Sequence, residues 1–489
     1  MKSRELLVVR ITNIICSIML ISPGLVNGQP TEKFASPPAT SVVPGTEPQI
    51  LRNKEEYSAA PGNPAPTLNT YSLNDCYRLT IVNNTNLKRA QNAINSNIID
   101  RETAKFSLYP SLYYNIGHYF SFGKNIDPVT NSYVFETFSG GYTSLNLQLN
   151  LFSAFNRINT IKQTGYIIQS SEYAKKQLEL ELLANVTLLY ARLSSDKEQL
   201  KTVRNNIEST LNEMEIINEK IKVGKLTRYE YYPFNARLNS QKVDLVTLQN
   251  DSLSALGDLR QLMNIPFDQP IELAQVDTTI LANLATVSIS AKDYIDSILY
   301  SHPAIRQAQL DEEVAEIGIK IVKSNAWPSV SVGGNVSSNY NINQVNNNGD
   351  KISLSNQLNN NLGQYINIGL RVPIFSQMQT ANRIKKERIN TDNSRLAKTE
   401  AINSISKIGY QSINDFNSAK EKYHVSKLAW EQNQLSYEMY KEKYRLGQVS
   451  SVELIAISDI LTTSSLKFLQ TKLELFFRYQ LLQLLKNGL

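Results

Sequence analysis

Hydrophobic and polar residues alternate with a period of two in four stretches of the chain. The stretches lie at 111–122, 144–151, 330–340 and 362–374, and the clearest reads SLNLQLNL at 144–151. This period is typical of β-strands with one apolar face, and polar loops within each pair of stretches predict two β-hairpins. Alternating segments of about ten residues are typical of membrane-spanning strands. A half-buried sheet in a soluble domain is the other interpretation.

A second pattern has the period of an α-helix. Between Phe155 and Val223 the chain has no Pro and only one Gly, and apolar residues recur at spacings of three, four or seven. This run predicts a single helix roughly 100 Å long. An equivalent run at 376–445 predicts a second helix of the same kind.

Shorter helices are predicted on either side of these runs. They lie at 72–105, 227–264, 291–325 and 450–486. Each has about half the length of a long helix, at 1.5 Å per residue. An entering helix stacked end to end on a returning one would therefore match one long helix, which predicts the wall of a helical cylinder.

Each long helix is followed by a turn of similar sequence. Gly224 precedes a Thr-x-x-Glu sequence that ends at Glu230, and Gly447 precedes a Ser-x-x-Glu sequence that ends at Glu453. Gly favours the left-handed conformation that ends a helix, and Ser/Thr-x-x-Glu predicts a capping box at the start of the next. Both segments are therefore predicted to be tips of helical hairpins.

The order of these elements occurs twice. LKRAQ at 87–91 recurs as IRQAQ at 305–309, 218 positions later, whereas Gly224 and Gly447 lie 223 positions apart. The offset grows within the predicted β-hairpin, where a surface loop absorbs extra residues at little cost. A repeat of this length predicts a duplicated domain, with the first copy at 71–275 and the second at 288–489.

The N-terminal region has a different composition. Residues 1–28 combine basic residues, an apolar stretch and small residues near the end, which predicts a secretory signal peptide. Residues 29–70 are rich in Pro, Ala, Ser and Thr, which predicts a disordered leader. Cys76 is the only cysteine left after cleavage, so no intrachain disulfide is expected.

Charge and histidine content exclude several classes of function. The chain has 50 basic and 44 acidic residues. No basic cluster contains interleaved aromatic residues, so nucleic-acid binding is not expected. His118, His302 and His424 lie on different predicted elements, without the spacing of a metal site or a catalytic triad. The sequence therefore predicts neither an enzyme nor a bound metal or cofactor.

Four strands are too few to close a barrel, which needs about eight even for a packed interior. An open sheet edge in a membrane would leave backbone groups without hydrogen bonds. A membrane-spanning sheet of this kind must therefore be shared between chains. Two chains would supply about eight strands and three about twelve, and only the larger barrel leaves an evident aqueous lumen.

The order of helix, β-hairpin, long helix, Gly turn and helix, present twice after a signal peptide, resembles the TolC-like outer-membrane efflux family over about 72–489. LRVPIF at 370–375 is similar to the family's strand end before a long helix, and GQVSSVE at 447–453 is similar to its hairpin tip. The Pro-rich leader departs from the family pattern. The first copy also departs from it, because LF at 151–152 is not preceded by a proline equivalent to Pro373.

The resemblance implies an α+β membrane protein that forms a homotrimer, with four strands per chain in a shared 12-stranded β-barrel and a long periplasmic α-helical barrel. It implies a passive exit duct of a tripartite efflux or type I secretion system, located in the cell outer membrane and reaching into the periplasm. Its partners would be outer-membrane lipid, a periplasmic membrane-fusion adaptor and an inner-membrane pump. The alternative function is a structural or adhesive surface protein with a coiled-coil stalk.

Three residues near the predicted tips are candidates for a gate. Glu230, Tyr444 and Glu453 resemble residues at the narrow periplasmic end of the family's tunnel. Threefold symmetry would turn each carboxylate into a ring, and acidic rings favour cations. The other interpretation is that the two glutamates complete capping boxes and that Tyr444 packs between helices.

Four further residues are candidates for adaptor docking. They are Gly224, Leu226, Gly447 and Val449, at the turns themselves. Turn chemistry alone is the other interpretation. The two roles are compatible, because a turn exposed at the tip of a tube is also a contact surface.

Overall fold

The computed structural model describes residues 69–126, 132–135, 137–276, 281–284, 287–342, 344–346 and 348–487. The predicted signal peptide, and the predicted leader as far as residue 68, lie outside the described residues. Asn69 and Thr70, the last two residues of the predicted leader, instead belong to strand β1 (Asn69–Tyr71).

Two helices of 67 residues each run through the long apolar-periodic segments, α4 (Asn156–Lys222) and α10 (Gln379–Arg445). The prediction of two long helices is confirmed. Each helix follows two consecutive residues with left-handed backbone, Ala154–Phe155 before α4 and Gln377–Met378 before α10. The strands therefore meet the helices through a sharp turn, which the alternation pattern does not indicate.

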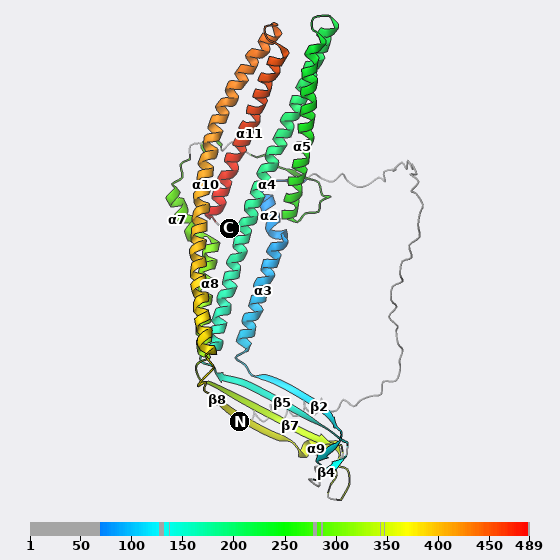
Figure 1. Cartoon of the computed structure of the whole chain (residues 1–489), viewed down its shortest axis with the longest axis vertical. Coiled ribbons are helices and arrows are strands. Elements are labelled where there is room, and N and C mark those ends of the chain that lie inside the picture. The colour runs from blue at the N-terminus through cyan, green and yellow to red at the C-terminus, as the bar shows by residue number, and fades with distance from the viewer. Residues whose placement is uncertain are drawn as a thin grey trace, which may run out of the picture. The chain divides into compact units, whose positions relative to one another are not determined.

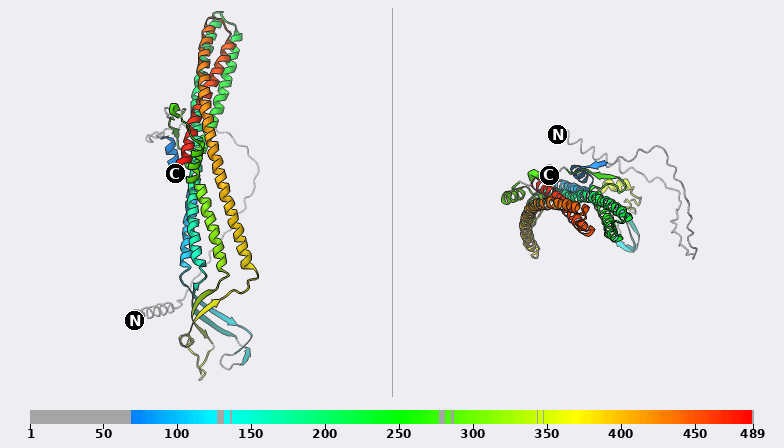
Figure 2. Two further views of the ribbon diagram at one scale, coloured as in Figure 1. Left: turned by 90° about the vertical axis from the view of Figure 1, so that its left-hand side faces the viewer. Right: turned by 90° about the horizontal axis from the view of Figure 1, so that it is seen from above.

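Each long helix returns on itself as a hairpin (Figure 1). Helix α5 (Tyr231–Met263) packs against α4, after a short 3₁₀ turn η1 (Arg228–Glu230). Helix α11 (Ser451–Asn487) packs against α10 and also against α4, so it joins the two hairpins. Seen from above, the helices follow an arc (Figure 2).

The two entering helices, predicted as continuous, are each broken in two. Helices α2 (Leu73–Asn83) and α3 (Thr85–Phe106) meet at Asn84. Asn84 is extended, with ψ 127°, and its side chain accepts hydrogen bonds from the first turn of α3. It also donates to the Leu262 carbonyl oxygen at 3.0 Å, which anchors the break against the end of α5.

The second break has a steric cause. Helices α7 (Ala291–Ser301) and α8 (Pro303–Ser324) meet at His302, whose ψ is also 127°. A residue before proline is pushed out of the helical region, so Pro303 ends α7 at this point. The His302 ring then caps α8 by accepting from the Ala304 amide.

The strands form one antiparallel sheet in the order β2-β5-β7-β8. Their bounds are β2 (Ser111–Ser121), β5 (Phe138–Phe152), β7 (Ser329–Asn341) and β8 (Gly363–Arg371). The two predicted hairpins are confirmed, and β5 pairs with β7 to join them. The polar loop after β7 contains a short helix, α9 (Leu354–Asn360), which is held by the buried Gln357 side chain.

Smaller elements connect these parts. Strands β3 (Lys124–Ile126) and β4 (Tyr133–Phe135) extend the first hairpin beyond the sheet. Strand β1 pairs in parallel with β6 (Ile271–Leu273), and α6 (Leu281–Leu284) follows. Among the described helices, none combines the length and hydropathy needed to cross a membrane.

The buried core lies where the helices meet rather than in the sheet. One cluster joins α2, α4, α5 and α11 around Val186, Leu259 and Phe477, and a second joins α7, α10 and α11 around Ile298 and Phe416. A third cluster, near the first tip, contains Met214, Phe234 and Leu238. These clusters fix the hairpins in register and so position the tips.

Candidate functional site at the hairpin tips

The two tips share the same helix-ending geometry. The Lys225 amide donates to the Lys220 carbonyl oxygen at 2.8 Å, and the Gln448 amide donates to that of Lys443 at 2.9 Å. Together with the preceding glycine amides, these bonds form the Schellman motif. Gly224 and Gly447 have φ of 74° and 75°, and a Cβ atom at either would meet nothing within 4 Å. The backbone conformation, not lack of space, therefore requires glycine at both turns.

The predicted capping box is present at the second tip. The Glu453 carboxylate accepts from the Ser450 amide at 2.7 Å and from its hydroxyl at 2.9 Å, and the Glu453 amide donates back to that hydroxyl. The Ser450 backbone bond, followed by the hydroxyl bond, lowers the pKa of the exposed Glu453 carboxyl. Glu453 therefore acts locally, at the start of α11.

The predicted capping box is wrong at the first tip. Thr227 makes no side-chain capping bond, because Arg228–Glu230 form a 3₁₀ turn that places Glu230 itself at the N-cap of α5. The Glu230 carboxylate instead accepts a hydrogen bond from the Ser451 hydroxyl at the start of α11. Ser451 is only 1% exposed. Glu230 therefore links the first hairpin to the second.

The Tyr444 side chain lies beside this link. Its hydroxyl is buried and has no partner among the described residues. Burial raises the pKa of the Tyr444 phenol, and the nearby carboxylates of Glu230 and Glu213 raise it further. The Lys220 ammonium lies 5.5 Å from the centre of the Tyr444 ring. The ring thus lies close to α4 at the level of the tips.

A second link between the hairpins lies below the tips. Arg237 on α5 donates to the Ser458 hydroxyl at 2.7 Å and pairs with Asp459 at 3.1 Å. Lower still, the Asn206 side chain contacts the Thr462 hydroxyl at 3.4 Å.

The α11 partners in these links share one helix face. Ser451, Ser458 and Thr462 follow at intervals of seven and four. Residues at such intervals lie on one side of a helix. Sequence reasoning missed this face, although a hydroxyl stripe at helical spacing would have indicated it.

Buried charge accompanies the second link. Burial raises the pKa of the half-buried Glu213 carboxyl on α4, and Arg237 and Lys441 oppose that rise. The Arg237 guanidinium is mostly buried, with its side chain 10% exposed, whereas the Asp459 side chain is 58% exposed. The second link is therefore centred on the mostly buried Arg237 guanidinium.

The four docking candidates differ in accessibility. Gly224 and Gly447 are exposed at the turns, and Val449 is half-buried. Leu226 packs against the apolar cluster of the first tip. The more exposed apolar side chains at the tips are Val223, Tyr229 and Leu446.

The histidines lie apart from this site. His118 bonds to Tyr340 and Ser139 across the sheet, and His302 caps α8. Burial lowers the pKa of His302. Among the described residues, no group of three His, Cys, Asp or Glu side chains has the geometry to hold a metal ion.

Known proteins are similar to this chain in sequence and in fold. Residues 76–264 match the model of the family described as outer membrane efflux protein. The chain is therefore similar to this family over less than half of its length. The match covers the first hairpin unit, from α2 to the end of α5, and confirms the resemblance drawn from the turn and strand motifs.

Individual proteins are also similar to this chain. The pyoverdine export outer membrane protein OpmQ of Pseudomonas aeruginosa is 21% identical over 284 residues, which is 57% of this chain and 56% of OpmQ. The structure of CusC has a TM-score of 0.72 at 16% identity, covering 85% of this chain and 92% of CusC. The outer membrane protein VceC of Vibrio cholerae has a TM-score of 0.71 at 13% identity, covering 85% and 96%.

Proposed function

We propose that three copies of this chain form an exit channel in the outer membrane, which conducts passively from the periplasm to the exterior as part of a tripartite efflux or type I secretion system. The observation that carries the proposal is the exposed sheet. Among the described residues, edge strands β2 and β8 each pair with a single strand. Their apolar side chains are exposed, including Ile116 at 72% and Ile366 at 81%.

The open edges support a trimer. In hydrocarbon, unpaired backbone groups at β2 and β8 would each cost several kcal/mol, so the edges must pair with other copies. Three copies would place β8 of one chain against β2 of the next and close a barrel of about twelve strands. Outer-membrane lipid would then cover the apolar outer face.

The helical layer supports the same assembly. Helices α10 and α5 lie at its two ends, because α11 and α4 pack between them. Both ends carry exposed apolar side chains, among them Val246 and Leu253 on α5 and Leu435 on α10. We infer that α5 of one copy packs against α10 of the next, which would close a periplasmic α-helical barrel.

The two halves of the chain, 71–275 and 288–489, are inferred to be copies of one unit. Two geometric features recur at the offset of 223 residues: the left-handed pairs before α4 and α10, and the glycine turns after them. Three copies of a doubled unit would place six similar hairpins around one axis. Such an arrangement needs little distortion to form a closed tube.

Gating is assigned to the tips. Glu230, Tyr444 and Glu453 would surround the narrow periplasmic end, where Glu230 holds α5 to α11 through Ser451. Opening would separate the two hairpins and break this link. Three Glu453 carboxylates would form an exposed ring that favours cations.

Docking of partners is assigned to the turns. Gly224, Leu226, Gly447 and Val449, with the exposed apolar residues beside them, would contact a periplasmic membrane-fusion adaptor. An inner-membrane pump would supply the energy. The structural or adhesive alternative is not favoured, because residues 76–264 match the outer membrane efflux protein family and a coiled-coil stalk gives no role to the sheet.

Planar-bilayer recording of the purified full-length oligomer tests the proposal. The channel predicts discrete conductance steps, whereas a stalk protein predicts none. Leu147→Pro, in the middle of β5, should abolish them because proline removes a ladder hydrogen bond. Leu147→Val is the matched control and should conduct normally. Absence of steps from the unaltered oligomer would overturn the proposal.

A further inference from the structure

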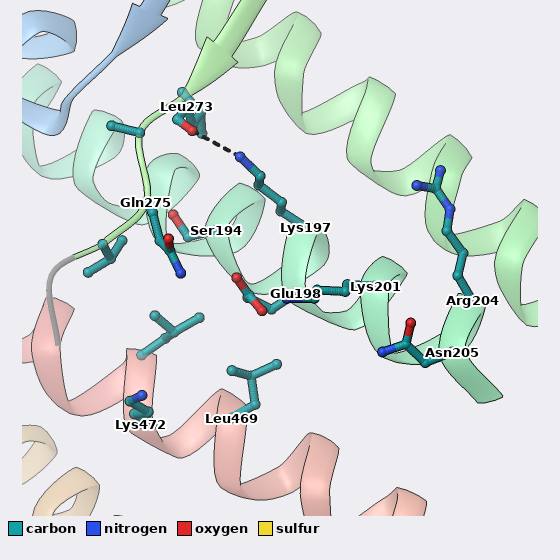
Figure 3. A pocket seen from close by; sticks show the side chains of 13 residues that line it. Ser194, Lys197, Glu198, Lys201, Arg204, Asn205, Leu273, Gln275, Leu469 and Lys472 are labelled. Carbon is teal, nitrogen blue, oxygen red and sulfur yellow. Dashed lines mark hydrogen bonds between the residues drawn. The ribbon is translucent and has the colours of Figure 1, made fainter. Parts of the chain in front are cut away.

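A hollow lies between α4, α11 and the segment that follows β6, away from the tips and the sheet. Its volume is about 470 Å³. Residues Leu273–Val276 border it on one side, and one face each of α4 and α11 forms the other walls (Figure 3). The hollow is partly open, so a ligand could enter from solvent.

Positive charge dominates the walls of this hollow. Its basic side chains are Lys197, Lys201, Arg204 and Lys472, and its acidic side chain is Glu198. Lys197 is already occupied, because it pairs with Glu272 at 2.8 Å and donates to the Leu273 carbonyl oxygen at 3.2 Å. Within the described part of the chain, the side chains of the other three have no ion pair or hydrogen bond. The residues that line the hollow therefore carry an excess of positive charge without partners among the described side chains.

The Ser194 hydroxyl provides an independent indication of a ligand. Ser194 lies on the α4 wall, is 8% exposed, and its hydroxyl has no hydrogen-bond partner among the described residues. Several other hydroxyls on α4 donate to the carbonyl oxygen four residues earlier, as Thr187, Thr202 and Thr210 do. A buried hydroxyl left without a partner costs about 1–3 kcal/mol, which a bound acceptor would recover.

Comparison with the equivalent positions in the second half of the chain shows which of these residues have a structural role. Lys420, 223 positions after Lys197, donates to the Val287 carbonyl oxygen at the same distance of 3.2 Å. This pair therefore serves to hold a connecting segment. The positions equivalent to Ser194 and Lys201 are Asn417, which is exposed, and His424. The Ser194 hydroxyl and the Lys201 side chain therefore have no equivalent in the second half.

We propose that the hollow binds a ligand that carries a carboxylate or phosphate group next to a short apolar portion. Lys201 and Lys472 would neutralise the anionic group, and the Ser194 hydroxyl would donate a hydrogen bond to it. Leu469 and Val276 offer an apolar wall to the rest of the ligand. Arg204 lies at the far end of the same α4 face, where it would attract the anion from solvent.

Isothermal titration of the purified full-length oligomer at low ionic strength tests this proposal. The probes are inorganic phosphate and glutarate. Comparing them shows whether the site binds a phosphate group or a carboxylate group. We expect saturable binding of at least one probe. Lys201→Glu should weaken it at least about tenfold, whereas Lys176→Glu, the same charge change elsewhere on α4, should leave it unchanged.

The Ser194→Ala variant distinguishes an effect on ligand binding from an effect on folding. Because the hydroxyl has no hydrogen-bond partner among the described residues, its removal should weaken probe binding about three- to tenfold without lowering the melting temperature. The proposal is overturned if neither probe binds saturably, or if Lys176→Glu weakens binding as much as Lys201→Glu. Unchanged affinity in Ser194→Ala would also overturn the proposal, because the Ser194 hydroxyl is the group that points to a ligand here.

Discussion

The two hairpin tips begin from nearly the same sequence and use their glutamates differently. At the second tip, Glu453 closes a capping box with Ser450, and its side-chain hydrogen bonds to the described residues stay at its own helix start. At the first tip, Glu230 leaves its own turn and accepts from Ser451 on the other hairpin. The helix-ending turns are alike, so the difference arises after the glycine. A shared local motif can therefore carry a local role in one copy and a linking role in the other.

The largest effect is expected from the arginine below the first tip. Arg237→Ala removes a mostly buried guanidinium that bonds to Ser458 and Asp459, and should destabilise the contact between α5 and α11 by about 2 kcal/mol. Amide hydrogen exchange in the tip halves of these helices should then accelerate about 30-fold.

Arg445 on the second tip is the matched control for Arg237. It pairs with Glu442 on its own helix, and both side chains are more than half exposed. Arg445→Ala should cost less than about 0.5 kcal/mol. Equal acceleration of exchange in the two variants would contradict the asymmetry between the tips.

Substitution of the two tip glutamates should have different effects on the resting conductance. Glu230→Gln weakens a charge-assisted bond between hairpins, and should raise the open fraction of the channel about tenfold. Glu453→Gln weakens only a local cap, so the open fraction should stay within about twofold of the wild-type value. Planar-bilayer recording measures both. A larger change in Glu453→Gln than in Glu230→Gln would reverse the assignment of roles.

Replacement of either turn glycine should destabilise its tip by the same amount, because the two turns have the same backbone geometry. Gly224→Ala and Gly447→Ala place a side chain on left-handed backbone and should each destabilise their tip by about 1 kcal/mol. Gly257→Ala, inside α5, is the control; its Cβ would meet Phe267 at an ordinary 3.7 Å, and it should be neutral or stabilising. Proteolysis of the tips under native conditions reports these changes. A marked difference between the two turns would show that their surroundings, not φ alone, set the cost.

The smallest effect concerns pH, and its sign differs between the tips. Burial raises the pKa of Glu213, so its contribution to stability is present at low pH and is lost as pH rises through the folded-state value. Hydrogen bonds lower the pKa of Glu453, so its contribution is present above the ordinary value of 4.5 and is lost as pH falls through the folded-state value. Glu213→Gln should therefore stabilise the tips at pH 7 and have little effect at pH 4. Hydrogen exchange at the two pH values measures this, and a destabilised variant at pH 7 would contradict the sign.

The sequence predicts those parts of the fold that depend on local patterns. Both 67-residue helices and both β-hairpins follow from apolar spacing, and the glycine turns follow from their residue type. The breaks at Asn84 and His302 had local signals that the helical pattern concealed: a side chain suited to capping, and a proline after the histidine. The early start of β5 at Phe138 was hidden because Gly140 and Gly141 interrupt the alternation.

The contacts between the halves could not be predicted in the same way. The pairing of β5 with β7, and the bonds from Glu230 and Arg237 to α11, join residues about 200 positions apart. No local rule specifies such partners. The Glu230 side chain could form either a capping box with Thr227 or a hydrogen bond to Ser451. Which of the two forms depends on how the hairpins pack against each other.

The link between Glu230 and Ser451 is the central claim, and a double-mutant cycle in planar bilayers tests it most directly. Glu230→Gln, Ser451→Ala and the double variant are compared with the wild-type oligomer by resting open fraction. If the two side chains hold the hairpins through one shared bond, the double variant should open no more than the stronger single variant. Open fractions that multiply independently would show that the two residues act separately and would contradict the account.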